Sequence, residues 1–402
     1  MVQKNVNHKK VLMVGPLPTA GNYVGGIGVI SSQILEHWNL PYDIVTYNTN
    51  TILRDFGSAN RLNFTNVCKF FRDGIQLVSI IRNERPDIVH FHTSRHRALL
   101  KDLLLVGLIR IFGHCRVVGH IHHASYSTLL VGDSEWGRLV QIKWLMAAFD
   151  RIVLMSEGIK QTLASRLSPA SRARFDYKTK VLYNFTSLPG QTDHGPRAVP
   201  AKPTLFFIGN VGRFKGIFDL LNCADALKRA GVKFEVVLAG PFDSPHEGER
   251  IKKLIESLNL SDSVKLIGPV SSAAKGDLFA AADIFVLPSY GEGVPLSMLE
   301  AMSYGLPVVA TAVGGIPEIL NGEEAGFLVP PGDVDALKAA VQKLILSSDL
   351  RREMGKKGRE RIEEFHRLET FLERLGSIYQ ELSAAAPGAD AVEVNEKCRP
   401  SR

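Results

Sequence analysis

The sequence predicts an α/β protein built from two parallel sheets, each with helices on both faces. Three observations predict this fold class. Short apolar runs rich in β-branched residues recur along the chain, with longer helical stretches between them. The runs are continuously apolar, which is typical of strands buried on both faces, and strand–helix–strand order implies parallel pairing. Finally, 402 residues are more than one core usually serves, so we expect two domains.

The apolar runs place the strands. In the first half we expect six, at residues 11–15, 43–46, 87–91, 116–120, 151–155 and 180–183. In the second half we expect six more, at residues 204–209, 234–240, 264–267, 283–287, 307–311 and 326–329. Ligands of such sheets bind beyond the carboxyl ends of the strands, so we expect the site in a cleft between two facing domains.

A Pro- and Gly-rich stretch, SLPGQTDHGPRAVPAKP at 187–203, separates the two sets of strands and is typical of a linker. We therefore expect an N-terminal Rossmann-like domain at 1–190, a linker at 191–203 and a C-terminal Rossmann-like domain at 204–365. A C-terminal helix at 366–382 can cross back to the first domain, and a disordered tail follows at 383–402.

Composition narrows the protein class. Hydrophobic residues make up 45% and charged residues 22%, which indicates a globular protein. The most apolar stretch, 99–112, contains Lys101, Asp102 and Arg110, and a bilayer span needs about 20 apolar residues. The basic N-terminus is followed only by VLMVG, which is too short for a signal-peptide core, so we expect a cytoplasmic protein. The four cysteines form no C-x-x-C pair, so neither a disulfide framework nor a zinc knuckle is indicated.

The net charge of +7 favours an anionic partner. No long Lys/Arg block and no aromatic–basic interleaving is present, so we expect no nucleic acid partner. An anionic membrane surface and phosphorylated sugars both remain open. Residues 63–80 are amphipathic, which suits either peripheral membrane contact or an ordinary helix packed on the core.

The most informative stretch is SYGEGVPLSMLEAMSYGLPVVATAVGGIPE, at 289–318. An expected strand leads into a Gly-flanked loop, and a helix is expected to begin near Pro295. The free amides and the dipole of such a helix start form an anion site. A diphosphate would lie on the backbone of the loop and the first turn, at Gly293, Val294, Pro295, Leu296 and Ser297.

Two carboxylates flank this helix start. Glu292 lies in the loop and Glu300 lies on the helix. A carboxylate has two acceptor oxygens and can bind both hydroxyls of a ribose, while the other acid can reach the sugar side of the phosphate. The alternative is a capping acid and a surface helix acid.

A second stretch, FFIGNVGRFKGIFDLL at 206–221, has a strand ending at Gly209 and then a loop with Arg213 and Lys215 before a helix. Two cations beside a helix start can neutralise charge developing on a diphosphate leaving group. The alternative is a pair of solvent-exposed loop cations.

Two N-terminal stretches follow expected strands. GNYVGGIGVI at 21–30 contains Gly25 and Gly26, which allow close approach of a ligand, although the G-x-G-x-x-G dinucleotide pattern is not met.

RVVGHIHHASY at 116–126 ends in a turn with several histidines. Together with the histidines of residues 90–96 it could bind zinc, but no acid accompanies the two groups. We expect no metal and no cofactor.

The chain resembles the retaining glycosyltransferases of the GT-B fold, in glycosyltransferase family 4, also called the glycosyl transferases group 1. The resemblance covers about residues 10–380. It is strongest at E-G-x-P-L-S-x-L-E-A-M, whose E-x7-E acids match Glu292 and Glu300, and at G-x-P-V-V-A-T-x-x-G-G-x-P-E over 305–318.

The resemblance implies roles for the matched residues. Glu300 would hold the donor ribose, Glu292 would lie by the transferred sugar, and Lys215 would be the phosphate lysine. Asn210 stands where the family usually has Arg, and Arg213, three residues on, is a candidate substitute.

In the first half, the resemblance places Gly25 and Gly26 toward the donor. His122 would bind the transferred sugar or contribute its backbone carbonyl to the reaction, with His120 and His123 as alternatives in the same turn.

We therefore expect transfer of a hexosyl group from a nucleotide diphosphate sugar to a saccharide or lipid-linked saccharide, with retention, in bacterial polysaccharide or glycolipid synthesis. The leaving diphosphate would act as the base, because no pair of carboxyls matches a nucleophile mechanism. The rivals are a sugar-nucleotide epimerase on the same fold and a non-catalytic sugar-nucleotide-binding protein. Sequence does not choose between UDP, GDP and ADP.

Overall fold

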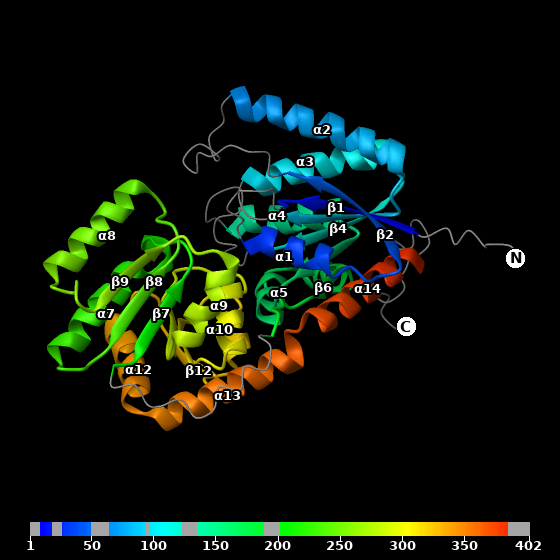
Figure 1. The fold of residues 1–402 in the computed structure, drawn as a ribbon. Coiled ribbons are helices and arrows are strands. Elements are labelled where there is room, and N and C mark those ends of the chain that lie inside the picture. Colours follow the sequence, from blue (N-terminus) through cyan, green and yellow to red (C-terminus); the bar gives the residue numbers. More distant parts are fainter. Residues whose placement is uncertain are drawn as a thin grey trace, which may run out of the picture. The chain divides into compact units, whose positions relative to one another are not determined.

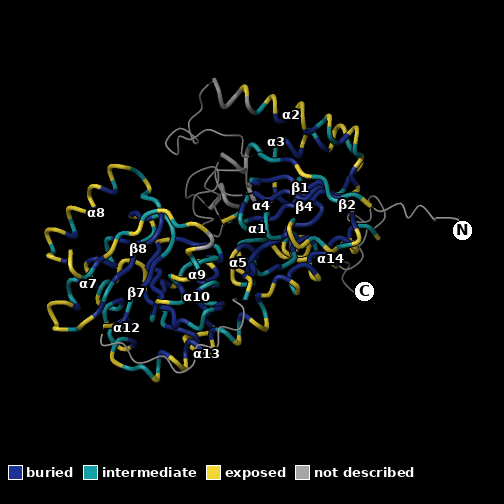
Figure 2. The backbone as a smooth tube through the Cα atoms, viewed as in Figure 1, coloured by how far each residue is buried: buried dark blue, intermediate teal, exposed yellow. Residues whose placement is uncertain are grey.

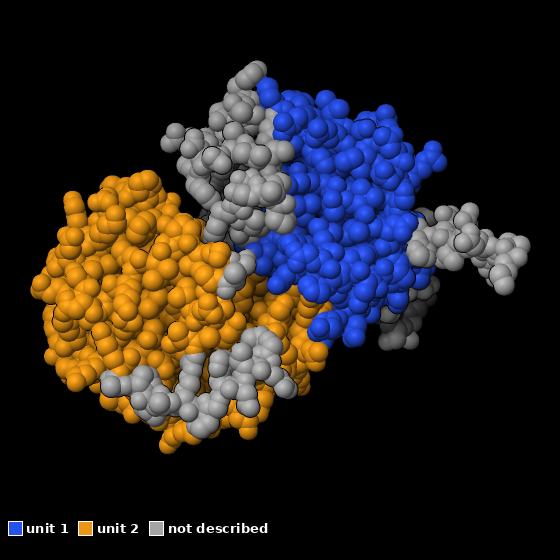
Figure 3. Space-filling model, in the orientation of Figure 1, with its two compact units in different colours: residues 1–183, 369–402 blue, residues 184–368 orange. Residues whose placement is uncertain are grey.

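The computed structural model describes residues 9–17, 26–49, 64–93, 97–122, 135–188 and 202–384. The chain forms two compact units (Figure 3). Unit 1 comprises residues 1–183 and 369–402, and unit 2 comprises residues 184–368. Most of the expected linker and of the expected tail lies outside the described residues.

Unit 1 contains a six-stranded parallel sheet with the order β2-β1-β3-β4-β5-β6 (Figure 1). Its strands are β1 (Lys9–Gly15), β2 (Tyr42–Asn48), β3 (Ile88–Thr93), β4 (Arg116–Ile121), β5 (Arg151–Leu154) and β6 (Thr179–Val181). Its helices are α1 (Gly26–Glu36), α2 (Phe64–Glu84), α3 (Arg97–Phe112), α4 (Glu135–Ala148), α5 (Glu157–Ala164), α6 (Pro169–Lys178) and α14 (Leu368–Ala384).

The two faces of this sheet are covered by different helices. Helices α2 and α3 lie on one side of the strands and α1 and α14 on the other (Figure 1). Successive side chains of a strand point to opposite faces. Val89 and Phe91 of β3 accordingly pack in the core with Leu77 of α2 and Leu105 of α3. The side chains of His90 and His92 point to the opposite face, where Tyr379 of α14 contacts His90.

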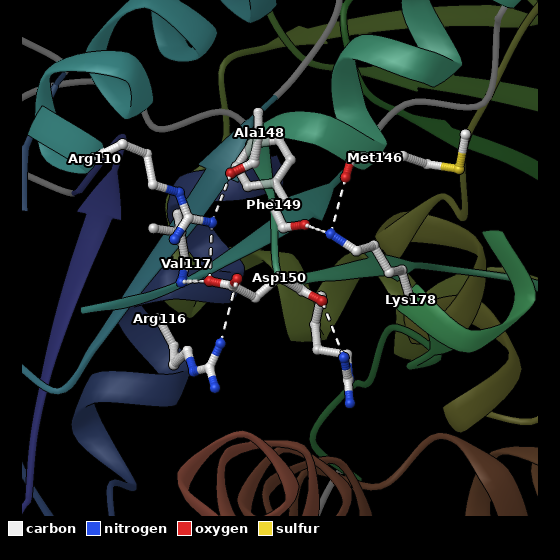
Figure 4. Close-up of polar contacts among 9 residues, drawn as sticks. Arg110, Arg116, Val117, Met146, Ala148, Phe149, Asp150 and Lys178 are labelled. Carbon is white, nitrogen blue, oxygen red and sulfur yellow. Dashed lines mark hydrogen bonds and ion pairs between the residues drawn. The ribbon is translucent and has the colours of Figure 1, made fainter. Parts of the chain in front are cut away.

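A buried carboxylate holds the junction between α4 and β5 (Figure 4). Asp150 accepts hydrogen bonds from the backbone N–H of Val117 at 2.6 Å and from Arg110 at 2.9 Å. Lys178 donates to the carbonyl oxygens of Met146 and Phe149, both at 2.9 Å, near the end of α4. A cation at the carboxyl end of a helix satisfies carbonyls that have no partner within the helix, so Lys178 has a structural role.

Unit 2 repeats the plan with the strand order β12-β11-β10-β7-β8-β9. Its strands are β7 (Thr204–Ile208), β8 (Glu235–Ala239), β9 (Val264–Gly268), β10 (Ile284–Leu287), β11 (Val308–Thr311) and β12 (Gly326–Val329). Its helices are η2 (Arg213–Lys215, one 3₁₀ turn), α7 (Ile217–Arg229), α8 (Pro245–Ser257), α9 (Ser272–Ala281), α10 (Leu296–Ser303), α11 (Ile316–Leu320), α12 (Val334–Leu346) and α13 (Ser348–Phe365). Helix α7 packs against α12, and α10 against α13.

The predicted fold class is confirmed: both sheets are parallel, and all twelve expected strands are present with ends that differ by two residues or fewer. The inner strands of both sheets are dark in the burial colouring of Figure 2, as expected for strands covered on both faces, whereas the edge strands β2 and β9 are partly exposed. No helix in the described ranges is both long and apolar enough to cross a bilayer.

Candidate functional site

The strand order of the unit 2 sheet reverses between the neighbouring strands β7 and β10. The chain runs outward from β7 through β8 to β9, and then from β10 through β11 to β12 on the other side. Ligands of open α/β sheets bind at such a switch point, outside the carboxyl ends of the strands. The loops that follow β7 and β10 carry Lys215 and Glu292, so both predicted motifs lie at this point.

Two helices at the switch point begin without a side-chain cap. Gly216 precedes α7 and Pro295 precedes α10, and neither offers a side-chain oxygen to the first amides. Helices α8, α9, α12 and α13 of the same unit each begin with a Ser or Asp side chain that accepts from the first turn. Uncapped amides at a helix start remain available to an anionic ligand. The expected helix start near Pro295 is present, as α10 begins at Leu296.

Two glycines fix the loops around these helix starts. Gly216 has φ +70°, and a Cβ there would lie 1.9 Å from the carbonyl oxygen of Pro288. Gly314 has φ +59°, and a Cβ there would lie 2.0 Å from the carbonyl oxygen of Glu292. Only glycine allows this approach of the backbones without strain. The loop carrying Lys215 therefore lies against the end of β10.

Lys215 and Glu292 form an ion pair. The Lys215 Nζ lies 2.6 Å from Glu292 Oε1, and Glu292 is buried. Ser289, also buried, donates its hydroxyl to the same oxygen at 2.7 Å. Thr311 of β11 donates to the carbonyl of Ser289 at 2.5 Å. The predicted phosphate lysine and the predicted sugar-side acid thus meet at one point, and the sequence analysis missed the two hydroxyl residues that orient them.

Glu300 is held by a lysine from another helix. Lys275 of α9 lies 2.5 Å from Glu300 Oε1, while Glu300 Oε2 is buried with no hydrogen-bond partner among the described residues. Burial raises the pKa of the Glu300 carboxyl, and the Lys275 ammonium opposes that rise. One oxygen is therefore paired with a cation, and the other is a buried acceptor whose hydrogen-bonding capacity is unused among the described residues. Nothing in the sequence around Lys275 signalled this pairing.

The other predicted residues of unit 2 fall near the same loops. Gly209 follows β7, and its amide donates to the carbonyl of Ala239 at 3.0 Å. Asn210 is the next residue in the chain. The guanidinium of Arg213 lies 5.1 Å from the centre of the Phe218 ring. The structure records no contact between Arg213 and Glu292 in the described residues, so the substitution of Arg213 for the usual arginine stays a prediction.

The loop that begins α10 is also tied to the first residues of unit 2. Asn184 donates its side-chain amide to the carbonyl of Val294 at 2.9 Å, and both groups are buried. His366 Nδ1 donates to the carbonyl of Asn184 at 2.7 Å, and the amide of Thr186 donates to the carbonyl of His366 at 2.9 Å. Asn184, to which the sequence analysis gave no role, therefore positions the loop of residues 289–295.

In unit 1, four histidines gather on one face of the sheet. His92 of β3 and His120 of β4 are paired in register. His92 Nδ1 lies 2.9 Å from His122 Nε2, and His90 Nδ1 lies 2.5 Å from the hydroxyl of Tyr379. Register and alternation bring the two histidine motifs together, as the zinc alternative of the sequence analysis supposed. Gly26 is the first residue of α1, and Gly25 and His123 lie outside the described residues.

The histidine cluster is held neutral. Burial lowers the pKa of the His92 imidazole to about 3. Burial first, and then the neighbouring imidazoles, lower the pKa of His90 and of His120 well below the usual range. The same causes lower the pKa of His122. An imidazole without its proton can accept a hydrogen bond from a sugar hydroxyl.

The cluster has only part of what a metal site needs. Candidate ligand atoms of His90, His92 and His120 lie within 4.8 Å of one another. The rings of His90 and His92 are stacked with planes 3° apart, so their in-plane lone pairs do not converge. No carboxylate or thiolate joins that group within the described residues, and a buried divalent ion would lack counter-charge. We assign no metal to it.

Comparison with known proteins then identifies the family. Residues 38–175 match the family model Glycosyltransferase Family 4, and residues 193–361 match Glycosyl transferases group 1. The N-acetyl-alpha-D-glucosaminyl L-malate synthase of Bacillus anthracis is 30% identical over 311 residues, which are 76% of this chain and 78% of that protein. The chain belongs to glycosyltransferase family 4.

Other relatives of this family 4 protein match over shorter shares of their length. The sulfoquinovosyl transferase of Arabidopsis thaliana is 28% identical over 301 residues, 72% of this chain and 56% of that protein. The putative colanic acid biosynthesis glycosyltransferase WcaL of Escherichia coli is 32% identical over 203 residues, 48% of this chain and 49% of that protein. The chain thus spans about half the length of several curated relatives it matches.

Solved structures confirm the GT-B fold of this family 4 protein. Sucrose-phosphate synthase from Thermosynechococcus elongatus aligns with a TM-score of 0.71 at 22% identity, covering 94% of this chain and all of that one. The Anabaena protein HepE in complex with UDP aligns with a TM-score of 0.68 at 15% identity, covering 92% and 100%. The expected family and fold are therefore confirmed.

Proposed function

We propose that this protein transfers a hexosyl group from a nucleotide diphosphate sugar to a hydroxyl acceptor, with retention of the anomeric configuration. One observation carries the proposal. The Lys215–Glu292 pair and the uncapped start of α10 lie together at the switch point between β7 and β10, with Glu300 on the same helix. A cation, free amides and an acceptor carboxylate are what a nucleoside diphosphate requires.

The groups divide the work on the donor. The first amides of α10 and the Lys215 ammonium would stabilise the diphosphate as negative charge grows on it. The unpartnered Oε2 of Glu300 would accept hydrogen bonds from the ribose hydroxyls. Glu292, held by Ser289, would keep Lys215 in place and lie beside the transferred sugar.

The reaction breaks the bond between the sugar anomeric carbon and the diphosphate oxygen. The acceptor oxygen forms the new bond to the same carbon on the same face, and its proton passes to an oxygen of the leaving diphosphate. The products are the glycoside and the nucleoside diphosphate. We also propose His122, which is neutral, as a residue that binds the transferred sugar, and Gly25 and Gly26 as residues near the donor, as the resemblance to the family implies.

The choice of donor and acceptor belongs to this proposal as well. UDP is bound in the HepE structure, so UDP-hexoses are the first donors to test, ahead of GDP and ADP sugars. Relatives are named for different acceptors, including L-malate, 2-deoxystreptamine and D-inositol 3-phosphate. We propose a saccharide or lipid-linked saccharide, in bacterial polysaccharide or glycolipid synthesis in the cytoplasm, with support from the colanic acid relative.

The experiment is an assay of nucleotide release from UDP-, GDP- and ADP-hexoses, with and without saccharide acceptors. We expect acceptor-dependent release from one donor, an unchanged anomeric configuration by NMR, and a rate at least about a hundredfold lower in Lys215→Met. Lys252→Met is the matched control, since Lys252 pairs with Glu249 on exposed α8. Deuterium uptake from solvent into the sugar without nucleotide release would indicate an epimerase instead. Binding without release under any condition would indicate a non-catalytic protein.

A further inference from the structure

One surface of unit 1 exposes an unusual number of large apolar side chains. Among the described residues of this unit, every exposed large hydrophobic side chain lies on α2, α3 or α4. They are Phe71, Ile75, Leu104, Ile111, Phe112 and Trp144. We call this surface the α2–α4 face. Phe71 is 62%, Ile75 71% and Ile111 73% exposed. A group of exposed apolar side chains of this kind is typical of an interaction surface.

The face is continuous from α2 to α3. Gly74, between Phe71 and Ile75, lies close to α3, since a Cβ there would be 3.1 Å from Leu108 Cδ1. Further along, the guanidinium of Arg82 lies 4.9 Å from the centre of the Phe112 ring. The apolar side chains of the two helices therefore form one surface.

The face continues from α3 to α4. Arg110 at the end of α3 donates to the carbonyl of Ala148 at 2.9 Å, one helical turn from Trp144. Helix α3 is mostly apolar, and its inner side, with Leu105 and Ile109, belongs to the core, against which Leu103 and Leu108 also pack. Leu104 and Ile111 on its outer side are 53% and 73% exposed, so they contribute little to the packing of unit 1.

The charge of this face has one sign. The exposed charged side chains described on the three helices are basic: Arg72, Arg82, Lys143 and Arg110, of which Arg110 is paired with the buried Asp150. Asp73 and Asp102 are buried, and the remaining acid, Glu84, pairs with Lys10 at 2.9 Å. Arginine and lysine among exposed apolar side chains match the interface of an anionic bilayer, where the cations meet headgroups and the apolar groups enter the acyl boundary.

We propose that the α2–α4 face docks this protein onto an anionic lipid surface. A second copy of the chain fits less well, because a symmetric contact would bring the basic side chains of the two faces together. The docking would bring the enzyme to an acceptor carried on a lipid. That consequence rests on the proposed glycosyl transfer, whereas the docking itself does not.

The experiment is co-sedimentation of the full chain with vesicles of phosphatidylcholine, with and without phosphatidylglycerol. We expect binding only to the anionic vesicles, weakened by about tenfold or more at high salt. The double variant Phe71→Ser/Ile75→Ser should lose about tenfold or more in partitioning, because both side chains are exposed and would enter the bilayer. Leu346→Ser is the matched control, since Leu346 is 72% exposed on α12 of unit 2.

Three outcomes would overturn the proposal. They are absence of binding to anionic vesicles, equal binding by the Phe71/Ile75 variant and the control, and a concentration-dependent dimer by analytical ultracentrifugation that the same variant abolishes. Thermal shift with nucleoside diphosphates, measured on each variant, keeps this proposal separate from the proposed function. It should be unchanged by the surface substitutions, so either idea can fail while the other stands.

Discussion

At the scale of single residues, Lys275 is the feature that most changes the view of the site. The E-x7-E motif predicted Glu300 as a ligand of the donor, but burial raises the pKa of that carboxyl and so favours its protonated, weaker acceptor form. Lys275 at 2.5 Å opposes the shift. We therefore regard Lys275 as a positioning residue that keeps Glu300 ionised.

Replacing Lys275 should make nucleotide binding depend on pH. In Lys275→Met the pKa of Glu300 rises further, so its charged form is lost as pH falls through that raised value. We expect the nucleoside diphosphate to bind this variant more weakly as the pH is lowered and to regain affinity as the pH is raised, measured by calorimetry across a pH series. Lys275→Arg should restore the wild-type profile. A loss of affinity that is equal at all pH values would contradict the role.

Gly216 offers a test of the loop geometry at the same scale. Gly216→Ala places a Cβ 1.9 Å from a carbonyl oxygen and forces alanine to φ +70°, so we expect a loss of about 3 kcal/mol or more in unfolding free energy. Gly231→Ala is the matched control, since Gly231 has φ +72° but nothing within 4 Å of its Cβ position. Its cost should be about 1 kcal/mol. Equal losses in denaturant titrations would show that the close approach to Pro288 does not matter.

At the scale of elements, the pairing of β3 with β4 makes unit 1 sensitive to acid. His90, His92 and His120 are buried with lowered pKa values, while in the unfolded chain they take up protons near pH 6.5. Below that pH the unfolded state binds more protons, so the stability they confer is full above about pH 6.5 and is lost as pH falls.

We expect the unfolding free energy to fall by up to about 1.4 kcal/mol per pH unit for each of these histidines below pH 6.5. Thermal unfolding between pH 7.5 and 5 measures the slope. His120→Leu should reduce it, and His37→Gln, at an exposed position just after α1, should leave it unchanged. A slope that is the same in both variants would show that the cluster is not its origin.

The elements also show what could be predicted from sequence. The strands and the start of α10 were predictable because apolar runs, Pro295 and the Gly-flanked loop are local signals. Asn184 and Lys275 were not, because their partners Val294 and Glu300 are distant in the chain. The two histidine motifs could be considered together from the sequence, but which of their rings meet depends on the register of β3 with β4, which is not a local signal.

At the scale of the whole molecule, the two units carry different groups of residues. Unit 2 carries the residues proposed to bind the donor, and unit 1 carries the neutral histidines and the α2–α4 face. The resemblance predicted the GT-B fold. Its longest motifs lie in unit 2, in the loops that follow β7 and β10. The acceptor was not predictable, since relatives named for different acceptors share this family.

The most direct test of the central claim is thermal unfolding of the intact protein with UDP, GDP and ADP, wild type beside Glu300→Ala. Binding only to the native state at a hundredfold excess over Kd stabilises it by about 2.7 kcal/mol. The account predicts an upward shift in Tm with one nucleotide, lost in Glu300→Ala. A well-folded wild-type protein that shows no shift with any of the three, or a variant that keeps the full shift, would contradict the donor site at β7 and β10.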